Sequence, residues 1–247
     1  MRLFTEEGRE GNYFVETNYG PLLVDTGAGS SQLPFTDETA KLPALRAAET
    51  HGCIGTATRQ FVRVQQLCCG EMVAEDLEVT LDERLHLLGN DVLRHYCFTF
   101  DLHRKELIVI APFVTEQPCR LGKKFHLFTK VSLNGECGLA MVDTGCAIST
   151  IDRDFVKSAL GCVQPQSSES VTDSTGVTQW FDKIYLDNML VQDVPFPIQP
   201  FIMMDYNPLN RALGFPIVAT IGASSMELKK FSFNQRDGFL KIDDYDF

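Results

Sequence analysis

The chain has 247 residues, 44% of them hydrophobic, and a net charge of −11. This length allows one large domain or two halves of ordinary size, each with a buried core. The acidic charge excludes nucleic acid and anionic membranes as expected partners, because a phosphate-binding face needs clustered lysine and arginine.

No stretch of the sequence reaches the roughly 18 consecutive apolar residues that a membrane span needs. The first ten residues, MRLFTEEGRE, carry acids and a glycine where a signal peptide has its apolar segment. We therefore expect a cytoplasmic protein with no membrane partner.

The eight cysteines, at positions 53, 68, 69, 97, 119, 137, 146 and 162, form no C-x-x-C pair. No histidine stands at ligand spacing from them, so we expect neither a metal site nor a cofactor. In a cytoplasmic protein they would be reduced and mostly buried as small apolar residues. Secretion with several disulfides is the alternative.

The first predicted hairpin ends in a carboxylate. Residues 13–19 alternate and meet the apolar run of residues 22–24 across a Gly-Pro turn, which predicts two paired strands. The second strand is predicted to be buried on both faces, because it has no polar side. It ends at Asp25, Thr26 and Gly27, and the glycine allows a sharp turn beside the acid.

After this turn, residues 30–34 predict a short strand, and residues 37–49 predict a helix interrupted at Pro43. The next segment, THGCIGTATRQFVRVQQL, places Gly52 and Gly55 before an alternating run, which predicts a hairpin. Its tip is either mobile, because glycines weaken packing, or part of a plain surface hairpin.

The first half closes where Leu87 and Leu88 run into Gly89. The elements predicted after this turn are a short helix at residues 91–95 and strands at 97–102 and 106–110. The apolar periodicity then lapses. We therefore divide the chain into a first half at 1–111, a linker at 112–122 and a second half at 123–247.

The second half begins with a hairpin that also ends in an acid. FHLFTKVSLNGECGLAMVDTG predicts two strands joined at Asn134 and Gly135, the strongest short hairpin signal. The second strand ends at Asp143, Thr144 and Gly145. Behind it, a helix capped by an aspartate and closed by a glycine is predicted at residues 153–160.

Nearly constant offsets relate the two halves. The two acids are 118 residues apart (143 minus 25). The other matches are Met72 and Asp76 with Met189 and Asp193 at 117, and Gly89, Phe98 and Phe100 with Gly222, Phe231 and Phe233 at 133. The two halves therefore repeat the same order of elements.

The increase in offset from 117 to 133 requires 16 extra residues before Gly222. We place them at residues 200–216, PFIMMDYNPLNRALGFP, and predict a long loop that exposes Phe201, Ile202 and Met203. This loop either walls a substrate groove or covers the sheet.

Two strand ends that each carry an aspartate are what a paired-carboxylate catalyst needs. Two carboxylates within hydrogen-bonding reach cannot both ionise in a site of low dielectric constant, so one keeps a proton. The ionised partner takes a proton from water, and the protonated one donates to the carbonyl oxygen under attack. One copy would be a weak signal, and the repeated frame makes the pair informative.

With its repeated D-T-G and its two apolar-apolar-Gly turns, the chain resembles the aspartic proteases. The segments LLVDTGAGSS and LHLLGNDVLRHYCFTFDL are similar to the active-site strand and the later turn-helix-strand unit of retropepsins. The resemblance covers nearly the whole chain. It implies an all-β, mostly antiparallel fold with a few short helices, in which two fused retropepsin-like units form a bilobal, pseudo-twofold arrangement.

The resemblance also implies roles for single residues. Asp25 and Asp143 match the catalytic pair that activates water. The supporting residues that it implies are Thr26 and Thr144, which bond across the lobe boundary, Gly27 and Gly145, which bring backbone close to the acids, and Gly89 and Gly222, which pack beneath the active-site loops. Residues 53–59 and 171–179 match the flaps only by their order.

The sequence departs from the pepsin pattern in two places. Ala28 and Cys146 stand where pepsins usually have a hydroxyl residue, and loss of that donor disfavours the charged carboxylate, so we expect activity at less acidic pH than in a digestive pepsin. The first flap lacks a tyrosine. Trp180 and Phe181 follow the second one, either as aromatic cover or as core residues.

The leading hypothesis is an aspartic endopeptidase that acts on a peptide or protein substrate without a metal or cofactor. It would act as a monomer, because both half-sites lie in one chain. The alternative is a catalytically silent module that keeps the fold as a binding or scaffold unit. A thiol or serine hydrolase has little support, because the five histidines lie outside any nucleophile context and G-x-S-x-G is absent.

Overall fold

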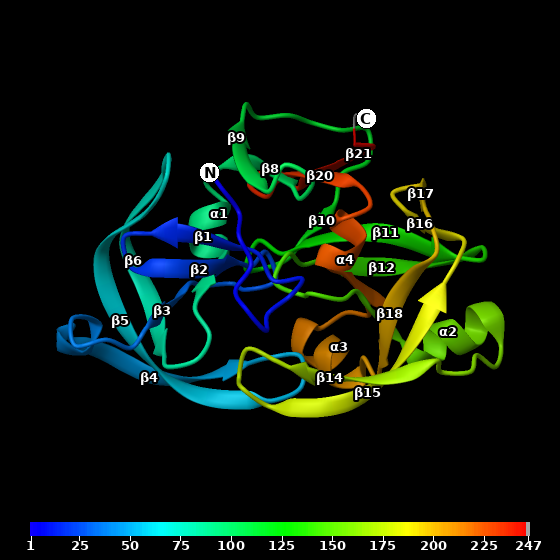
Figure 1. Cartoon of the computed structure of the whole chain (residues 1–247), viewed down its shortest axis with the longest axis horizontal. Helices are drawn as coiled ribbons and strands as arrows, with labels where there is room; N and C mark the ends of the chain where they lie inside the picture. The colour runs from blue at the N-terminus through cyan, green and yellow to red at the C-terminus, as the bar shows by residue number, and fades with distance from the viewer. Residues whose placement is uncertain (246–247) are drawn as a thin grey trace.

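The computed structural model describes residues 1–245 of the chain. Within them the molecule is mostly β, with a few short helices, which confirms the broad fold class expected from the sequence. Figure 1 shows one large sheet from each half and a third, smaller sheet to which both halves contribute. Most strand pairs are antiparallel, but both large sheets also contain parallel pairs and are therefore mixed.

The first half forms a seven-stranded sheet in the order β1-β2-β7-β3-β6-β5-β4. Its strands are β1 (Phe14–Thr17), β2 (Gly20–Val24), β3 (Gln32–Pro34), β4 (Ala44–His51), β5 (Thr56–Cys69), β6 (Met72–Asp82) and β7 (Leu87–Leu88). A single turn of 3₁₀ helix, η1 (Thr39–Lys41), precedes β4.

The second half forms a ten-stranded sheet that follows β14-β15-β18-β13-β19-β12-β11-β16-β17, with β10 beside β11. Its strands are β10 (Arg120–Leu121), β11 (Leu127–Leu133), β12 (Glu136–Val142), β13 (Thr150–Asp152), β14 (Ser167–Thr172), β15 (Thr178–Leu186), β16 (Met189–Val191), β17 (Val194–Phe196), β18 (Gln199–Met204) and β19 (Ala219–Ile221).

The same path of seven strands occurs in both large sheets. The path β1-β2-β7-β3-β6-β5-β4 of the first half corresponds to β11-β12-β19-β13-β18-β15-β14 of the second. The pairs β2 with β7 and β12 with β19 are both parallel. The repeat reaches single residues, since Asp76 and Asp193 both have left-handed backbone, with φ of 53° and 62°. The repeat deduced from sequence offsets is therefore also a repeat of topology.

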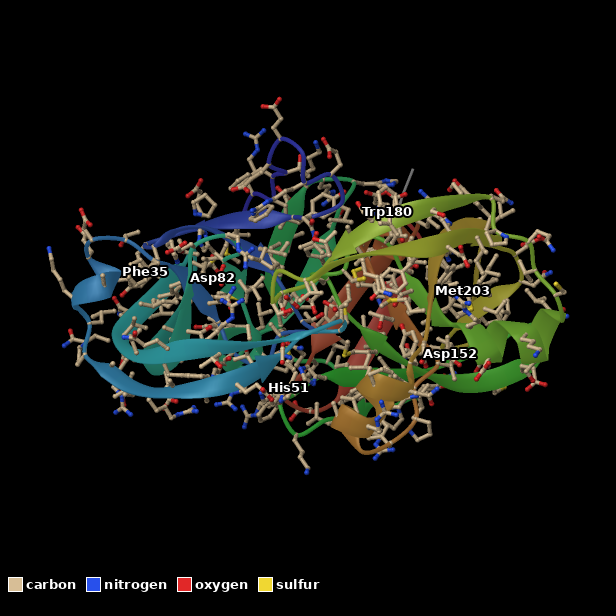
Figure 2. All side chains as sticks on the ribbon, turned by 90° about the horizontal axis from the view of Figure 1, so that it is seen from below. Phe35, His51, Asp82, Asp152, Trp180 and Met203 are labelled. Carbon is tan, nitrogen blue, oxygen red and sulfur yellow. The ribbon has the colours of Figure 1, made fainter. Side chains whose placement is uncertain are left out.

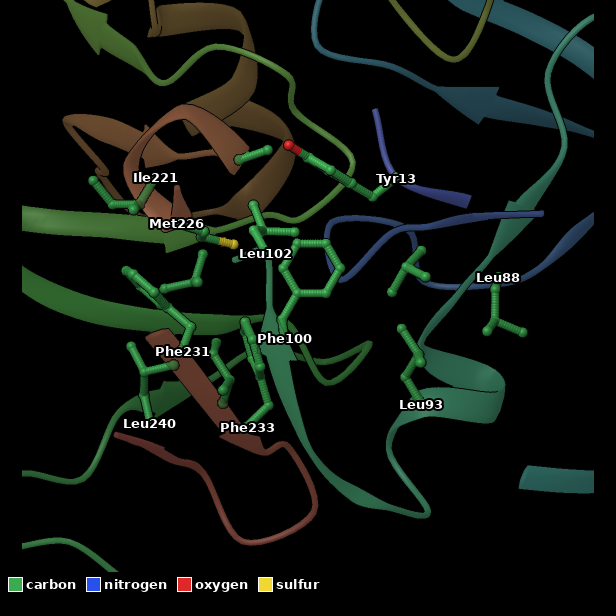
Figure 3. Packing of buried hydrophobic residues seen from close by; sticks show 14 of the residues in the cluster. Tyr13, Leu88, Leu93, Phe100, Leu102, Ile221, Met226, Phe231, Phe233 and Leu240 are labelled. Atoms are coloured by element: carbon green, nitrogen blue, oxygen red, sulfur yellow. The ribbon is translucent and has the colours of Figure 1, made fainter. Parts of the chain in front are cut away.

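The third sheet joins the halves. It runs β21-β20-β8-β9, from β8 (Cys97–Asp101) and β9 (Glu106–Ile110) of the first half and β20 (Lys230–Asn234) and β21 (Phe239–Asp243) of the second. Phe98 lies opposite Phe233, and Phe100 lies opposite Phe231. The rings of Phe98 and Phe233 stack at 4.9 Å, and all four side chains are fully buried. Figure 3 shows Phe100, Phe231 and Phe233 in this packing. One hydrophobic core therefore continues from one half into the other.

Four short α-helices complete the described fold. They are α1 (Asn90–Leu93), α2 (Arg153–Leu160), α3 (Asn207–Leu213) and α4 (Ala223–Met226). α1 and α4 follow the matched Gly89 and Gly222. The predicted cap of α2 is confirmed, because the Asp152 carboxylate accepts a hydrogen bond of 3.1 Å from the Phe155 amide and Gly161 ends the helix at φ 74°.

The predicted helix at residues 37–49 is wrong over most of its length. Only η1 is helical, and Ala44–His51 is the strand β4. Ala44–His51 contains good helix formers, but Pro43 limits any helix before it, and antiparallel pairing with β5 holds the segment extended. Tertiary pairing overrides local propensity here.

The prediction of an exposed loop at residues 200–216 is also wrong. Phe201, Ile202 and Met203 lie in β18, between β13 and β15, and are buried. Apolar side chains that the sequence placed on a loop therefore belong to the core of the second half.

Strand register shows that the 16 extra residues are divided in two. Thr150 pairs with Ile202 where Gln32 pairs with Thr80, which gives an offset of 122 (202 minus 80). Five of the extra residues (122 minus 117) thus lie before β18 and eleven (133 minus 122) lie after it. The later insertion carries α3.

The expectation that most cysteines are buried is wrong as well. All eight are unpaired, and only Cys69 and Cys97 are buried. Those exposed are Cys53, Cys137 and Cys162, which stand at a hairpin tip, at the start of β12 and after α2.

Within residues 1–245, the chain has no helix with the length and apolar character that crossing a membrane requires.

We expect replacement of Phe233 by alanine to lower the free energy of unfolding by about 3–5 kcal/mol, because it removes a buried ring from the sheet that joins the halves. Urea denaturation followed by Trp180 fluorescence and by circular dichroism measures this change. Both signals should move in a single transition. Phe35→Ala is the control, since that ring is 52% exposed and should cost little. Separate transitions for the two signals would show that the shared sheet does not couple the halves.

Candidate active site

Asp25 and Asp143 lie at equivalent strand ends and are brought together at the centre of the molecule. Each follows a buried strand, β2 or β12, that pairs in parallel with a short strand, β7 or β19. The Asp25 amide donates to the Leu88 carbonyl at 3.0 Å, and the Asp143 amide donates to the Ile221 carbonyl at 2.9 Å. The backbone behind each carboxyl group is thus held in the same way.

The two carboxyl groups, called here the carboxyl pair, are within hydrogen-bonding reach of each other. The Gly27 amide bridges them, donating to Asp25 Oδ1 at 2.9 Å and to Asp143 Oδ1 at 3.2 Å. The Gly145 amide donates to Asp143 Oδ1 at 2.9 Å. A Cβ at Gly27 would collide with the carboxylate of Asp143, and one at Gly145 would collide with that of Asp25, so only glycine fits at either place.

Burial decides the protonation of this pair. Loss of solvent raises the pKa of the Asp25 carboxyl well above its usual value, and the nearby charge of Asp143 raises it further. Burial also raises the pKa of Asp143, against the opposing effect of its hydrogen bonds. Both shifts favour the protonated form, as expected where two neighbouring carboxyl groups cannot ionise together.

Two threonines fasten the halves together directly beneath the pair. The Thr26 amide donates to Thr144 Oγ1 at 3.1 Å, and the Thr144 amide donates to Thr26 Oγ1 at 3.0 Å. Each hydroxyl in turn donates to a carbonyl of the other half, Thr26 to Val142 at 2.9 Å and Thr144 to Val24 at 2.7 Å. Both threonines are fully buried, so these four bonds have no competition from water.

Two serines that were not predicted from the sequence form hydrogen bonds with the matched glycines Gly89 and Gly222. Ser31 Oγ accepts from the Gly89 amide at 3.0 Å, and Ser149 Oγ accepts from the Gly222 amide at 2.9 Å. Both serines are fully buried. Their separation of 118 residues, equal to that of the two acids, was the sequence signal that could have found them.

Two long hairpins reach toward each other on the side of the molecule opposite the shared sheet (Figure 1). The first hairpin is β4 with β5, and the second hairpin is β14 with β15. Asp173 at the second tip accepts hydrogen bonds from the Ile54 amide at 2.9 Å and the Gly55 amide at 2.8 Å of the first. Arg59 donates to the Ser174 carbonyl at 2.6 Å. The tips are therefore joined to each other, a contact that sequence reasoning missed.

The hydrogen bonds that Asp173 accepts in this contact favour its ionised form. Burial alone would raise the pKa of its carboxyl group, but hydrogen bonds from the Thr175 side chain and from the Gly55 and Ile54 amides outweigh burial and hold the pKa below its usual value. The Thr175 hydroxyl and amide both donate to Asp173 Oδ1, at 2.5 and 2.9 Å.

The aromatic residues of the second hairpin lie on opposite faces of β15. Trp180 is 70% exposed, which rules out a place in the core (Figure 2). Phe181 is half-buried and packs against a cluster of buried residues in the second half, which also receives Ile54 from the first hairpin. That cluster consists of Phe128, Met141, Ile202, Met204, Tyr206 and Ile217.

Within residues 1–245, no group of three or more histidine, cysteine, aspartate or glutamate side chains could hold a metal ion. Comparison with models of known protein families and with curated proteins gives no match.

We expect Thr144→Val to lower the free energy of unfolding by about 2–4 kcal/mol, because it leaves the Thr26 amide and the Val24 carbonyl buried without a partner. Urea denaturation measures the change. Thr144→Ser keeps the hydroxyl and is the matched control. Equal stability of the valine and serine variants would show that the crossed hydrogen bonds do not hold the halves together.

Proposed function

We propose that the chain is an aspartic endopeptidase, which hydrolyses peptide bonds with a water molecule activated between Asp25 and Asp143. The observation that carries the proposal is the pair itself, in which the buried Asp25 and the half-buried Asp143 lie within hydrogen-bonding reach and are bridged by the Gly27 amide. The repeated topology supports the further proposal that the two halves are the lobes of a bilobal acid-protease fold with pseudo-twofold symmetry.

The chemistry follows from the shared proton. In the singly protonated pair, the ionised carboxylate takes a proton from water as the oxygen attacks the peptide carbonyl carbon. The protonated carboxyl group donates to the carbonyl oxygen, which gives a neutral tetrahedral intermediate. The carboxyl group that took the water proton then passes it to the amide nitrogen, while the other carboxylate takes a proton from a hydroxyl of the intermediate. The C–N bond breaks, which releases the amine and the carboxylic acid and leaves the pair singly protonated again. Gly27 and Gly145 keep both carboxyl groups in place throughout.

The joined hairpins support a peptide substrate. They extend from the two halves and meet tip to tip, so an extended chain held between them and the carboxyl pair would be shielded from water. Both half-sites belong to one chain, and a monomer therefore suffices in this proposal.

The residues after each D-T-G support activity at mildly acidic pH. Ala28 has no side-chain donor, and the Cys146 thiol donates to the Ile148 carbonyl at 3.0 Å. Neither side chain therefore gives a hydrogen bond that would favour the charged carboxylate. With burial raising the pKa of both acids, the pair should gain its shared proton at higher pH than it would beside hydroxyl donors.

We expect Asp25→Asn and Asp143→Asn each to lower kcat/KM by about 100-fold to 10,000-fold, because either change removes one member of the acid and base pair. Cleavage of a library of internally quenched peptides measures the loss. Asp37→Asn, an exposed aspartate, is the matched control. A statine-type inhibitor should block the wild-type protein.

Cleavage that survives in either single variant would exclude a shared pair. A folded wild-type protein that cleaves no peptide in the library would contradict the proposal and favour a silent binding module.

We expect Ala28→Ser to move the acidic limb of the pH profile to lower pH by roughly 0.5–1 unit. Below the pKa of the general base both carboxyl groups are protonated and activity is lost, and a new hydroxyl donor would lower that pKa. Profiles of kcat/KM against pH measure the shift, with Ala28→Gly as the variant that adds no donor. A wild-type optimum below about pH 3, or equal profiles for the two variants, would contradict the electrostatic argument.

A further inference from the structure

The two halves share a backbone frame but differ in side chains at equivalent positions near the carboxyl pair. Three residues before Leu87 stands Arg84, and three residues before Thr220 stands Ile217. Leu87 and Thr220 are equivalent, because they pair with Leu23 and Met141 at the ends of the two acid-bearing strands. The sequence therefore places a guanidinium group in one half where the other half has an aliphatic side chain.

A second position differs in the same sense. Ser30 lies five residues after Asp25, and Ile148 lies five residues after Asp143. Ile148 packs against the buried cluster that contains Ile217. The first half is thus polar at both positions and the second half is apolar at both.

Ile217 belongs to an apolar cluster that meets the opposite hairpin. It is buried, and Ile54 from the tip of the first hairpin packs against the same cluster. Phe181 and Phe215 are half-buried there. These partly exposed side chains, and not Ile217 itself, are the apolar groups that a bound side chain can contact.

Arg84 takes the corresponding place on the other side. Its guanidinium lies against Gly176 at the tip of the second hairpin, where a Cβ would collide with it. The next residue, Leu85, packs with Ala28 against one small cluster, so this segment lies beside the turn that carries Asp25. Arg84 also borders a cavity of about 260 Å³ beside the first hairpin, whose lining includes Glu83 and the Arg59–Asp82 ion pair.

The Arg84 guanidinium has no ion pair or hydrogen bond within residues 1–245, whereas its neighbours are engaged. Arg59 forms a buried ion pair with Asp82. The carboxylate of Asp173 is held by the Ile54 and Gly55 amides and by Thr175. An exposed cation without a partner, in a chain of net charge −11, is a selective place for an anionic group.

We propose that Arg84 is a specificity-determining residue, and that the chain binds peptides with an acidic side chain on one side of the scissile bond and an apolar side chain on the other. This inference rests on the proposed function. A glutamate can accept two hydrogen bonds from the guanidinium, and a glutamine of the same shape lacks the charge. The apolar cluster around Ile217 would instead disfavour a charged side chain.

The test compares pairs of quenched peptides that differ only by glutamate or glutamine, placed in turn at each of the three positions on either side of the cleaved bond. We expect one position on one side to favour glutamate by about fivefold to tenfold in kcat/KM, which corresponds to one desolvated charge-assisted contact. The preference should shrink as salt is added.

Arg84→Ile, which makes the two sides alike, should abolish the glutamate preference and favour leucine at that position. Arg84→Lys should keep part of the glutamate preference, because lysine keeps the positive charge but lacks the planar guanidinium that donates two parallel hydrogen bonds. Arg63→Ile is the matched control, since Arg63 is an exposed arginine of β5 that faces Asp76 at 3.4 Å. Thermal unfolding checks that each variant is folded.

The same peptides are also tested for binding to Asp25→Asn by fluorescence anisotropy. A wild-type protein that cleaves peptides without a glutamate preference, or with one that survives Arg84→Ile, would overturn this inference and leave the proposed function standing. Absence of cleavage together with glutamate-selective binding that Arg84→Ile removes would support the inference and overturn the proposed function. Absence of both would overturn both.

Discussion

The confinement of two carboxyl groups to one buried place is the constraint on which the rest of the structure depends. Two like charges at this distance repel each other, so the fold must hold them together by other means. Thr26 and Thr144 do so with four hydrogen bonds across the halves, and the glycines after them leave room for the opposite acid. The raised pKa values of the two carboxyl groups are a consequence of burial and, at Asp25, of the neighbouring charge.

The structure separates what the repeat must preserve from what it can vary. The strand order, the threonines and the buried serines recur in both halves, because each half must present its acid in the same way. The side chains around the carboxyl pair do not position the acids and can therefore differ between the halves. Arg84 is exposed and Ile217 is buried at equivalent places, so a nearly symmetric frame carries different side chains in the two halves.

The sequence could predict those features whose signal is local or repeated. The two acids, the hairpin at Asn134 and the capped helix α2 depend on neighbouring residues, and the offsets of 118, 117 and 133 between matched residues revealed the common topology. β4 could not be predicted, because its helix-forming residues are held extended only by β5. The strand β18 was not predicted because its apolar residues lie close to prolines. The role of Asp173 was not predicted because its hydrogen-bond donors, Ile54 and Gly55, lie 119 and 118 residues away in the chain.

The bonded hairpin tips also bear on kinetics. In the proposed function, a peptide without a free end near the site would reach the carboxyl pair after the bonds from Ile54 and Gly55 to Asp173 have broken. For such a substrate, capture would be gated by this opening, on the microsecond-to-millisecond timescale of loop motions, and would fall below the diffusion limit. Stopped-flow association rates that equal those of short, open-ended peptides would show that the tips impose no such gate. In the proposed function, the bonded hairpin tips would therefore both shield the carboxyl pair from water and limit the association rate of the substrate.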